Sequence, residues 1–269
     1  MQIDFSAADG TRMAAWDFIQ GLLNWRLWAY LGVQDIRQRY RRSSFGPLWL
    51  ALGLGVTILG IGILYSQILK TSPGNFVPFV AISLLVWNFV SSMINESAFL
   101  FNAGVGLMLS SRVPYTSFVL RGLVRNLMVA AHCLVPVVIA FLFYRYPVHW
   151  VGLVAIPGLI LLIANMYWIS LCLGILCLRF RDVAQIVIYL TQLALFVTPI
   201  IWMPTQIRPG SPYVALNPLN HLLNLVRAPI FFGIVPTESF VFCLAMLGAG
   251  GFLTFFVMVR FRRSLAFWI

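Results

Sequence analysis

Long apolar stretches recur along almost the whole of this 269-residue sequence, and they constrain its fold more than any other feature. About 20 apolar residues in a helix are enough to cross the hydrocarbon core of a bilayer. Hydrophobic residues make up 61% of the chain and charged residues only 9%, whereas soluble domains carry roughly 25% charged residues. We therefore expect an all-α, polytopic membrane protein whose residues 1–269 form a single transmembrane domain.

The hydropathy pattern predicts six membrane-spanning helices within residues 47–259. Their expected bounds are Pro47–Leu69, Phe76–Asn95, Ser117–Tyr144, Val151–Cys177, Val183–Met203 and Pro236–Val259. An even number of spans places both termini on one side of the membrane. The segment before them carries Asp4, Asp9 and Asp17 and lacks a basic region followed by an apolar core, so we expect no cleavable signal peptide.

Basic residues are distributed unequally between the two sides that this topology defines. The side of the termini has fourteen, namely Arg12, Arg26, Arg37, Arg39, Arg41, Arg42, Arg112, Arg121, Arg125, Arg179, Arg181, Arg260, Arg262 and Arg263. The other side has four, namely Lys70, Arg145, Arg208 and Arg227. The positive-inside rule therefore predicts cytoplasmic termini, and it accounts for the net charge of +11 without a nucleic-acid partner.

The segment Pro204–Pro236 departs from the regular pattern of spans and short loops. Its "HLLNLVRAPIFFGIV" stretch is apolar, but prolines divide the segment into pieces too short to cross a bilayer. This combination favours one or two short helices that dip into the outer leaflet, where protein or water must satisfy the free backbone groups. An apolar external loop is the alternative.

The segment before the first span, residues 25–42, is predicted to be an amphipathic helix along the cytoplasmic interface. Helical spacing puts Trp28, Val33 and Ile36 on one face and Arg37 and Arg41 together elsewhere. Asp35 precedes Arg39 by four residues, which favours a helix by a few tenths of a kcal/mol.

The sequence "SSFGP" that follows is typical of a break, after which Pro47 suits the first turn of a span. We interpret the abrupt end of the basic run as a change of direction, from lying on the membrane to crossing it. The alternative for each arginine is that it only obeys the positive-inside rule.

Five stretches, in this order, resemble ABC-2 type exporter permeases, in particular the transmembrane subunits that export O-antigen and related lipid-linked polysaccharides. They are "DIRQRYRRSSFGPLW" from Asp35, "RGLVRNLMVAAHCLV" from Arg121, "LRFRDVAQI" from Leu178, "LFVTPIIWMP" from Leu195 and "LNPLNHLLNLVRAPI" from Leu216. Together they extend over nearly the whole chain. One position departs from the family pattern, because Cys133 follows His132 where members often have asparagine.

The resemblance implies a homodimer of six-span subunits with a polymer channel along the dimer axis and two separate ATP-hydrolysing subunits below. The sequence is consistent with that division, because it contains no G-x-x-x-x-G-K-[ST] loop to hold a nucleotide's phosphates. We expect this chain to bind no cofactor or metal itself, with ATP and Mg²⁺ on the partner subunit. The four cysteines fall in apolar segments and lack metal-ligand spacing, so we interpret them as small hydrophobic residues.

The resemblance also suggests where the ATPase subunit docks. The loop "FNAGVGLMLSSRVPY" from Phe101 resembles the family's coupling element, and its alternative is a plain connector. The residues expected to contact the ATPase subunit are Met108, Leu109 and Arg112 of that loop together with Arg37, Arg41 and Arg42. A second hypothesis is that Arg37, Arg39, Arg41 and Arg42 attract the pyrophosphate of a lipid-linked substrate.

Two further groups of residues are candidates for a role within the membrane. Glu96 lies at the inner end of the second span and is expected to pair with Arg121 or Arg125, because an unpaired carboxylate near hydrocarbon is costly. This pair either holds the helices together during gating or is purely structural. His132, deeper in the third span, is a candidate for a bond across a helix interface. Aromatic rings suit a sugar-conducting pore, and the candidates are Tyr65, Trp87, Tyr189, Phe196 and Trp202, with packing and interface belts as the alternative.

Other function classes find less support in the sequence. No two of the seven acidic residues lie in spans as a catalytic dyad, and H-E-x-x-H and G-x-S-x-G are absent, which argues against a membrane-embedded enzyme. The spans are poor in charged residues, which argues against ion coupling. We therefore predict a homodimeric permease of the bacterial cytoplasmic membrane that exports lipid-pyrophosphate-linked polysaccharide, with membrane lipids around it. Export of teichoic acid, capsule or a small lipid or drug is the nearest alternative.

Overall fold

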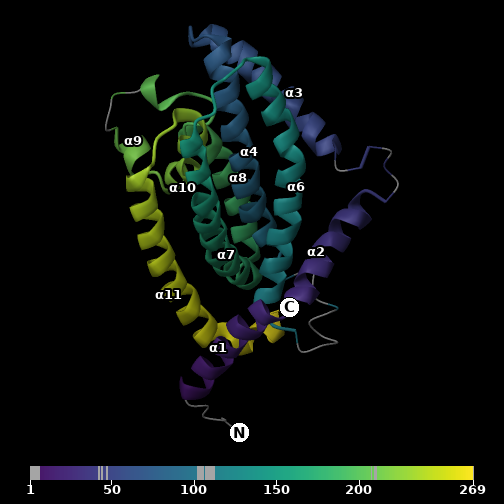
Figure 1. Ribbon diagram of the computed structural model, residues 1–269. Coiled ribbons are helices and arrows are strands. Elements are labelled where there is room, and N and C mark those ends of the chain that lie inside the picture. The colour runs from purple at the N-terminus through teal and green to yellow at the C-terminus, as the bar shows by residue number, and fades with distance from the viewer. Residues whose placement is uncertain are drawn as a thin grey trace.

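The computed structural model describes residues 7–41, 43, 45–46, 48–101, 106, 113–206, 208 and 211–268. Every regular element in this part of the chain is a helix, which confirms the all-α prediction. The long helices are α3 (Leu48–Ile68), α4 (Pro73–Ser97), α6 (Thr116–Phe143), α7 (Ala155–Arg179), α8 (Arg181–Val197) and α11 (Thr237–Trp268). They form one bundle, and both chain ends lie at the same end of it (Figure 1).

Five of these helices are long and apolar enough to cross a membrane, in agreement with a multi-pass membrane protein. The predicted span Val183–Met203 needs correction, because α8 ends at Val197 after 17 residues. The reason is Pro199, which disfavours helical backbone angles at the preceding residue, and Thr198 is extended with a ψ angle of 139°. At 1.5 Å per residue, α8 is roughly 25 Å long, which is shorter than the roughly 30 Å hydrocarbon core.

Helix α4 is the centre of the bundle. It packs against α3, α6, α7, α8 and α10, and 78% of its most apolar window is buried inside the single chain. Phe76, Phe79 and Val90 are fully buried. A helix that is apolar on all sides is expected at such a position, because its neighbours cover every face. By contrast, α3 and α11 are mostly uncovered, since only 22% and 17% of their windows are buried.

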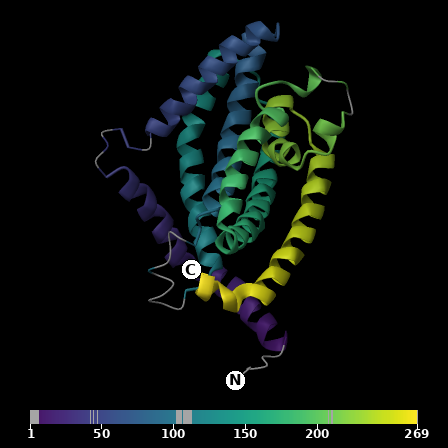
Figure 2. The same cartoon turned by 180° about the vertical axis from the view of Figure 1, so that it is seen from behind.

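Two N-terminal helices, α1 (Ala7–Leu23) and α2 (Trp25–Arg39), run across the end of the bundle that holds the termini (Figures 1 and 2). The predicted helix over residues 25–42 corresponds to α2, which ends at Arg39, and its position along a membrane interface stays a prediction. Helix α1 was not predicted. Ile36 is buried while Arg37 and Arg39 are exposed, as the amphipathic pattern required. The chain then turns into α3 close to Gly46, whose φ angle of +54° suits glycine.

The segment between α8 and α11 forms short helices, as predicted. These are the turns η3 (Pro204–Gln206) and α9 (Pro212–Ala215), the helix α10 (Pro218–Arg227) and the π-helical turn η4 (Ala228–Phe232), and a further short turn, η2 (Trp150–Val154), precedes α7. Helix α10 is largely buried against α4, α7 and α11, so it is part of the core and not a loose loop. The depth at which it lies in a membrane stays a prediction.

The close contact between α7 and α10 depends on a glycine. A Cβ atom at Gly158 would lie 2.1 Å from the carbonyl oxygen of Leu225, so α10 could not keep its position. We expect Gly158→Ala to destabilise the detergent-solubilised chain by about 1–3 kcal/mol, although alanine favours helix more than glycine does. Gly248→Ala in α11 is the matched control, because a Cβ atom there would have no atom within 4 Å. Thermal unfolding of both variants measures the difference, and equal or higher unfolding midpoints for Gly158→Ala would contradict this packing.

Candidate functional site

Asp17 of α1 is fully buried, and its side chain caps the N-terminus of α6. Its carboxylate accepts hydrogen bonds from the backbone N–H groups of Tyr115 at 3.2 Å and Thr116 at 3.1 Å. The Thr116 hydroxyl lies 3.1 Å from the same carboxylate and 2.8 Å from the Asp17 carbonyl oxygen, and it donates at this junction. An anion at a helix N-terminus satisfies free N–H groups and interacts favourably with the helix dipole.

Arg262 of α11 supplies the countercharge for Asp17, with its Nε 3.0 Å from Oδ2. The same guanidinium lies over the rings of Trp16 and Tyr115, each at 5.6 Å. Burial raises the pKa of the Tyr115 phenol, Arg262 lowers it and Asp17 adds to the rise, so the phenol is neutral at physiological pH. One buried carboxylate thus joins α1, α6 and α11.

Asp35 of α2 makes a second attachment to α6. Arg121 donates to both of its carboxylate oxygens, from Nε at 2.8 Å and from Nη2 at 2.5 Å, and Arg125 donates from Nη1 at 3.0 Å. The spacing suggested an intrahelical ion pair between Asp35 and Arg39. Among the described residues, Asp35 pairs with Arg121 and Arg125 instead. A two-point pair with Arg121 is the stronger interaction, because it is planar and partly shielded from water.

Glu96 of α4 continues this arrangement. Arg125 Nη2 lies 2.6 Å from its Oε2, and the buried Asn126 amide donates to the same oxygen. Of the two predicted partners of Glu96, the structure thus selects Arg125, while Arg121 is bound to Asp35; a role of the pair in gating stays a prediction. We call Asp17, Asp35 and Glu96, with their partners on α6 and α11, the carboxylate clamp.

Two glycines allow the N-terminal helices to approach α6 closely enough for the carboxylate clamp to form. A Cβ atom at Gly21 would lie 1.9 Å from the Thr116 hydroxyl oxygen, and one at Gly32 would lie 2.9 Å from the Val124 side chain. His132 lies further along α6, and its Nδ1 is 2.7 Å from the Met128 carbonyl oxygen of its own helix. Among the described residues, His132 therefore makes no hydrogen bond to another helix.

The candidate basic residues lie beyond the carboxylate clamp. Arg37, Arg39 and Arg41 are exposed. Arg42, Met108, Leu109 and Arg112 lie outside the described residues, so the proposed contact with an ATPase subunit stays a prediction.

The candidate aromatic residues do not share one environment. Tyr189 and Phe196 are 66% and 60% exposed on the outward face of α8, and Tyr65 is half-buried on α3. Trp202 is partly buried, and its Nε1 donates to the Phe196 carbonyl oxygen at 2.9 Å. Trp87 is only 5% exposed and packs in the core of the subunit, so it does not contribute to an outer surface here.

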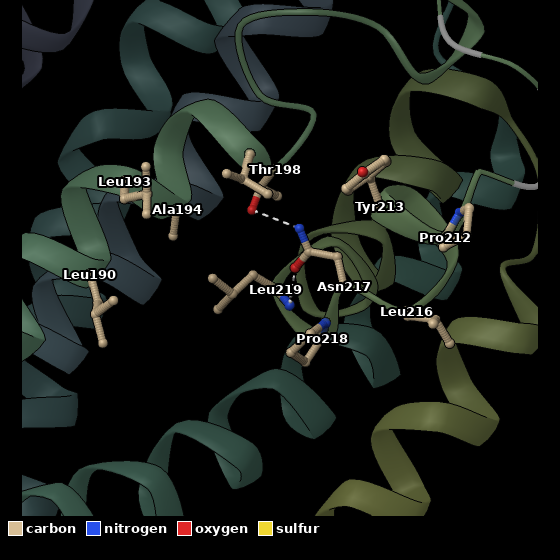
Figure 3. Close-up of a pocket in the computed structure, with 11 residues that line it drawn as sticks. Leu190, Leu193, Ala194, Thr198, Pro212, Tyr213, Leu216, Asn217, Pro218 and Leu219 are labelled. Carbon is tan, nitrogen blue, oxygen red and sulfur yellow. Dashed lines mark hydrogen bonds between the residues drawn. The ribbon is translucent and has the colours of Figure 1, made fainter.

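An open cavity of about 350 Å³ lies between α8 and the short helices that follow it (Figure 3). Its wall is mostly apolar and includes Leu193, Val197 and Tyr213. Asn217 orders this corner, because its amide donates to the Thr198 hydroxyl at 3.0 Å while its Oδ1 accepts from the Leu219 backbone N–H at the start of α10. These hydrogen bonds fix the part of the cavity wall that lies at the end of α8.

Arg227 at the end of α10 is fully buried, although the sequence placed it on an external segment. Its guanidinium donates to Ser83 at 3.3 Å, Asn220 at 3.0 Å, Asn224 at 2.6 Å and the Pro199 carbonyl oxygen, and it lies 5.0 Å from the Phe79 ring centre. Burial lowers the pKa of this guanidinium to about 9, so it stays charged at neutral pH. Arg227 thereby ties α10 to α4 and to the end of α8.

No group of histidine, cysteine, aspartate and glutamate side chains suited to a metal ion occurs in the part of the chain that the structure describes. Cys133, Cys172, Cys177 and Cys243 are free and at least partly buried, in keeping with their interpretation as small hydrophobic residues. The organised polar groups of the described residues include the carboxylate clamp and the Arg227 network.

Comparison with known proteins decides the family. The model of the family described as "ABC-2 type transporter" matches residues 26–231. The chain belongs to the ABC-2 type transporter family. Two curated proteins that this ABC-2 transporter resembles are both named O-antigen export system permease protein RfbA. The protein from Klebsiella pneumoniae is 25% identical over 76% of this chain and 80% of its own length, and the protein from Myxococcus xanthus is 25% identical over 79% and 83%.

The carboxylate clamp of this ABC-2 transporter can be tested at its most buried point. In Asp17→Asn, an amide replaces one accepting oxygen and leaves Arg262 without its countercharge. We expect a loss of roughly 1–3 kcal/mol in stability, because buried donors lose their acceptor. Asp182→Asn is the matched control, since Asp182 is exposed and has no ion pair among the described residues. The measurement is thermal unfolding in detergent, and equal midpoints for the two variants would show that the Asp17 contacts contribute nothing.

Proposed function

We propose that this ABC-2 transporter is the transmembrane subunit of an exporter that moves lipid-linked polysaccharide of the O-antigen type from the cytoplasm to the periplasm. The observation that carries the proposal is the similarity to two permeases named for O-antigen export, which extends over about three quarters of the chain. A separate ATPase subunit, which binds ATP and Mg²⁺, drives the movement. Support for this division comes from the sequence, which has no phosphate-binding loop.

The proposed location is the bacterial cytoplasmic membrane, with both termini in the cytoplasm. Both termini lie at one end of the bundle, the exposed Arg37 and Arg39 belong to the helix pair that crosses this end, and the exposed Arg41 follows α2 (Figure 1). Basic residues concentrate on the cytoplasmic side of membrane proteins. The short helices α9 and α10 then lie at the periplasmic end.

Two copies of the chain form the proposed permease, each with one ATPase subunit. The outward face of α8 supports a channel between copies, because Ile186, Tyr189, Leu193 and Phe196 are all more than half exposed in the single chain. Aromatic rings present flat apolar surfaces to the C–H faces of sugars, which lets a polymer slide without one deep binding site. In this proposal Tyr189 and Phe196 line the channel, whereas the buried Trp87 does not.

The carboxylate clamp can transmit movement from the proposed ATPase contact to the helices within the membrane. A subunit that presses on the exposed arginines of α2 moves a helix joined to α6 through Asp35, and α6 is joined to α4 through Glu96. Movement at the cytoplasmic surface therefore reaches the central helix of the bundle through charged contacts of 3.0 Å or less.

The direct test is a strain that lacks this chain. We expect lipid-linked glycan to accumulate on the cytoplasmic face of the inner membrane and the intact chain to restore its export. Fractionation with a glycan probe applied to each membrane face measures this. Normal surface glycan without accumulation would exclude polysaccharide export and favour a small-molecule substrate.

A second prediction concerns the exposed arginines at the end of α2 and directly after it. We expect the double variant Arg37→Glu and Arg41→Glu to reduce export at least several-fold, because it repels an anionic substrate head and changes two of the predicted contacts with the ATPase subunit. The matched double variant Arg145→Glu and Arg208→Glu changes the same charge at exposed positions on the proposed periplasmic side. Both variants should assemble normally by size-exclusion chromatography, and unchanged export in the first would exclude the role of these arginines.

A further inference from the structure

The last part of α11, residues 258–268, turns across the end of the bundle that holds the termini (Figure 2). We call it the α11 end segment. It packs against the bundle, because Met258 and Leu265 are fully buried, whereas Phe267 is 88% exposed. Helix α1 crosses the same end and packs against α11. The α11 end segment therefore has a fixed position beneath the long helices.

The α11 end segment contacts the connection between α4 and α6. The guanidinium of Arg262 lies 5.6 Å from the ring centre of Tyr115, which directly precedes α6. Arg262 also pairs with Asp17, which accepts a hydrogen bond from the Tyr115 backbone N–H. The Tyr115 ring forms an edge-to-face pair at 6.0 Å with Phe101, which lies shortly after α4 and is only 2% exposed. The two rings thus join the described ends of this connection, and Arg262 fixes one of them.

The α11 end segment also contacts the turn between α7 and α8. The guanidinium of Arg179, the last residue of α7, lies 4.9 Å from the ring centre of Trp268. The same guanidinium lies 5.7 Å from the ring of Phe180, the single residue between α7 and α8. Phe180 is extended, with a φ angle of −128° and a ψ angle of 97°, so the chain changes direction there. Trp268 therefore contacts the cation at the point where α7 gives way to α8.

One helix thus holds two connections that lie far apart in the sequence. Arg262 and Trp268 are six positions apart on α11, which corresponds to roughly 9 Å along a helix axis. Because a helix is stiff over this length, the distance between the two contacts is fixed. The first connection leads into α6, and the second leads into α8, whose outward face lines the proposed channel.

We propose that the α11 end segment positions both connections for the ATPase subunit, with Arg262 and Trp268 as the positioning residues. This proposal rests on the proposed function, in which both connections lie on the cytoplasmic side. An ATPase subunit outside the membrane acts on the spans through the segments that join them. Because the α11 end segment holds both segments, a movement imposed on one is shared with the other, and α6 and α8 respond together.

The first test measures how much ATP is hydrolysed for each glycan moved in sealed inside-out vesicles, with the ATPase subunit that co-purifies with the intact chain. Arg262→Lys keeps a positive charge for Asp17 but lacks the flat guanidinium that lies over the Trp16 and Tyr115 rings. Trp268→Ala removes the ring at the second connection. We expect each variant to raise the ratio of ATP to glycan at least three-fold, because hydrolysis then proceeds without joint movement.

Matched variants separate positioning from a general loss of structure. Arg260→Lys makes the same change at an exposed arginine whose ring contact is with the adjacent Phe261. Phe267→Ala removes the exposed ring next to Trp268. Both controls should keep the ratio of the intact chain. A merely structural role would lower the amount of folded protein and leave this ratio unchanged. Unchanged ratios in both Arg262→Lys and Trp268→Ala would therefore overturn the proposal.

The second test is amide hydrogen exchange of the purified full chain in detergent, which needs neither glycan nor ATPase subunit. In the intact chain the Tyr115 N–H bonds to Asp17, and the Phe180 N–H bonds to the Leu176 carbonyl oxygen at 2.9 Å. We expect Trp268→Ala to speed exchange in peptides that contain Tyr115 as well as in those that contain Phe180, and Arg262→Lys to do the same. Faster exchange only at the connection that each variant touches would overturn joint positioning. If Arg262→Lys does not fold, Trp268→Ala decides the test.

The two measurements keep this proposal separate from the proposed function. If the intact chain moves no glycan, polysaccharide export fails, while the exchange result still decides whether the α11 end segment holds both connections. If the intact chain exports glycan and both variants keep its ratio of ATP to glycan, export stands and the positioning role is rejected. The two failures are therefore distinguishable.

Discussion

Helices α1 and α2 are attached to α6 by carboxylates that are buried or nearly buried. Ion pairs of the same carboxylate clamp connect α6 to α4 and α1 to α11. Asp17 is fully buried, and Asp35 keeps only 12% of its side chain exposed. Removing such charges from water is costly, so each must find several donors to be tolerated. Asp17 finds backbone N–H groups and Arg262, and Asp35 finds two arginines. Loss of one partner leaves an uncompensated charge, which makes the docked position of these helices specific.

The opposite end of the bundle is organised by a cation that has no carboxylate partner among the described residues. Arg227 is held by neutral oxygens of Ser83, Pro199, Asn220 and Asn224 and by the Phe79 ring. These groups come from α4, from the chain after α8 and from α10. Any displacement of the short helices after α8 must therefore break hydrogen bonds to a fully buried charge. The α8 segment ends against this fixed point, which is consistent with its short length.

The sequence predicted the elements that local pattern determines. Apolar length located α3, α4, α6, α7 and α11, and amphipathic spacing located α2. Helix α1 was missed because its support is not local: Asp17 binds residues 98 and 99 positions away, and most helical stability in proteins comes from tertiary packing.

Local sequence spacing also failed to predict the partners of Asp35 and Arg227. Asp35 had a partner four residues away in Arg39, yet it binds Arg121, because a two-point pair shielded from water is stronger than an exposed one. Arg227 was assigned to an external segment because the acceptors that bury it lie up to 144 residues away. The end of α8 at Val197 could have been predicted from the sequence, since Pro199 disfavours helical backbone angles at the residue before it.

The proposed export is measured most directly as ATP-driven movement of glycan in sealed inside-out membrane vesicles that contain this chain and the proposed ATPase subunit. In such vesicles the cytoplasmic face is outermost, so export carries lipid-linked glycan into the lumen. We predict that ATP makes the glycan resistant to an externally added glycan-degrading enzyme, and that vesicles without the chain show no change. ATP hydrolysis in the presence of lipid-linked glycan, without any gain in protected glycan, would contradict polysaccharide export by this chain.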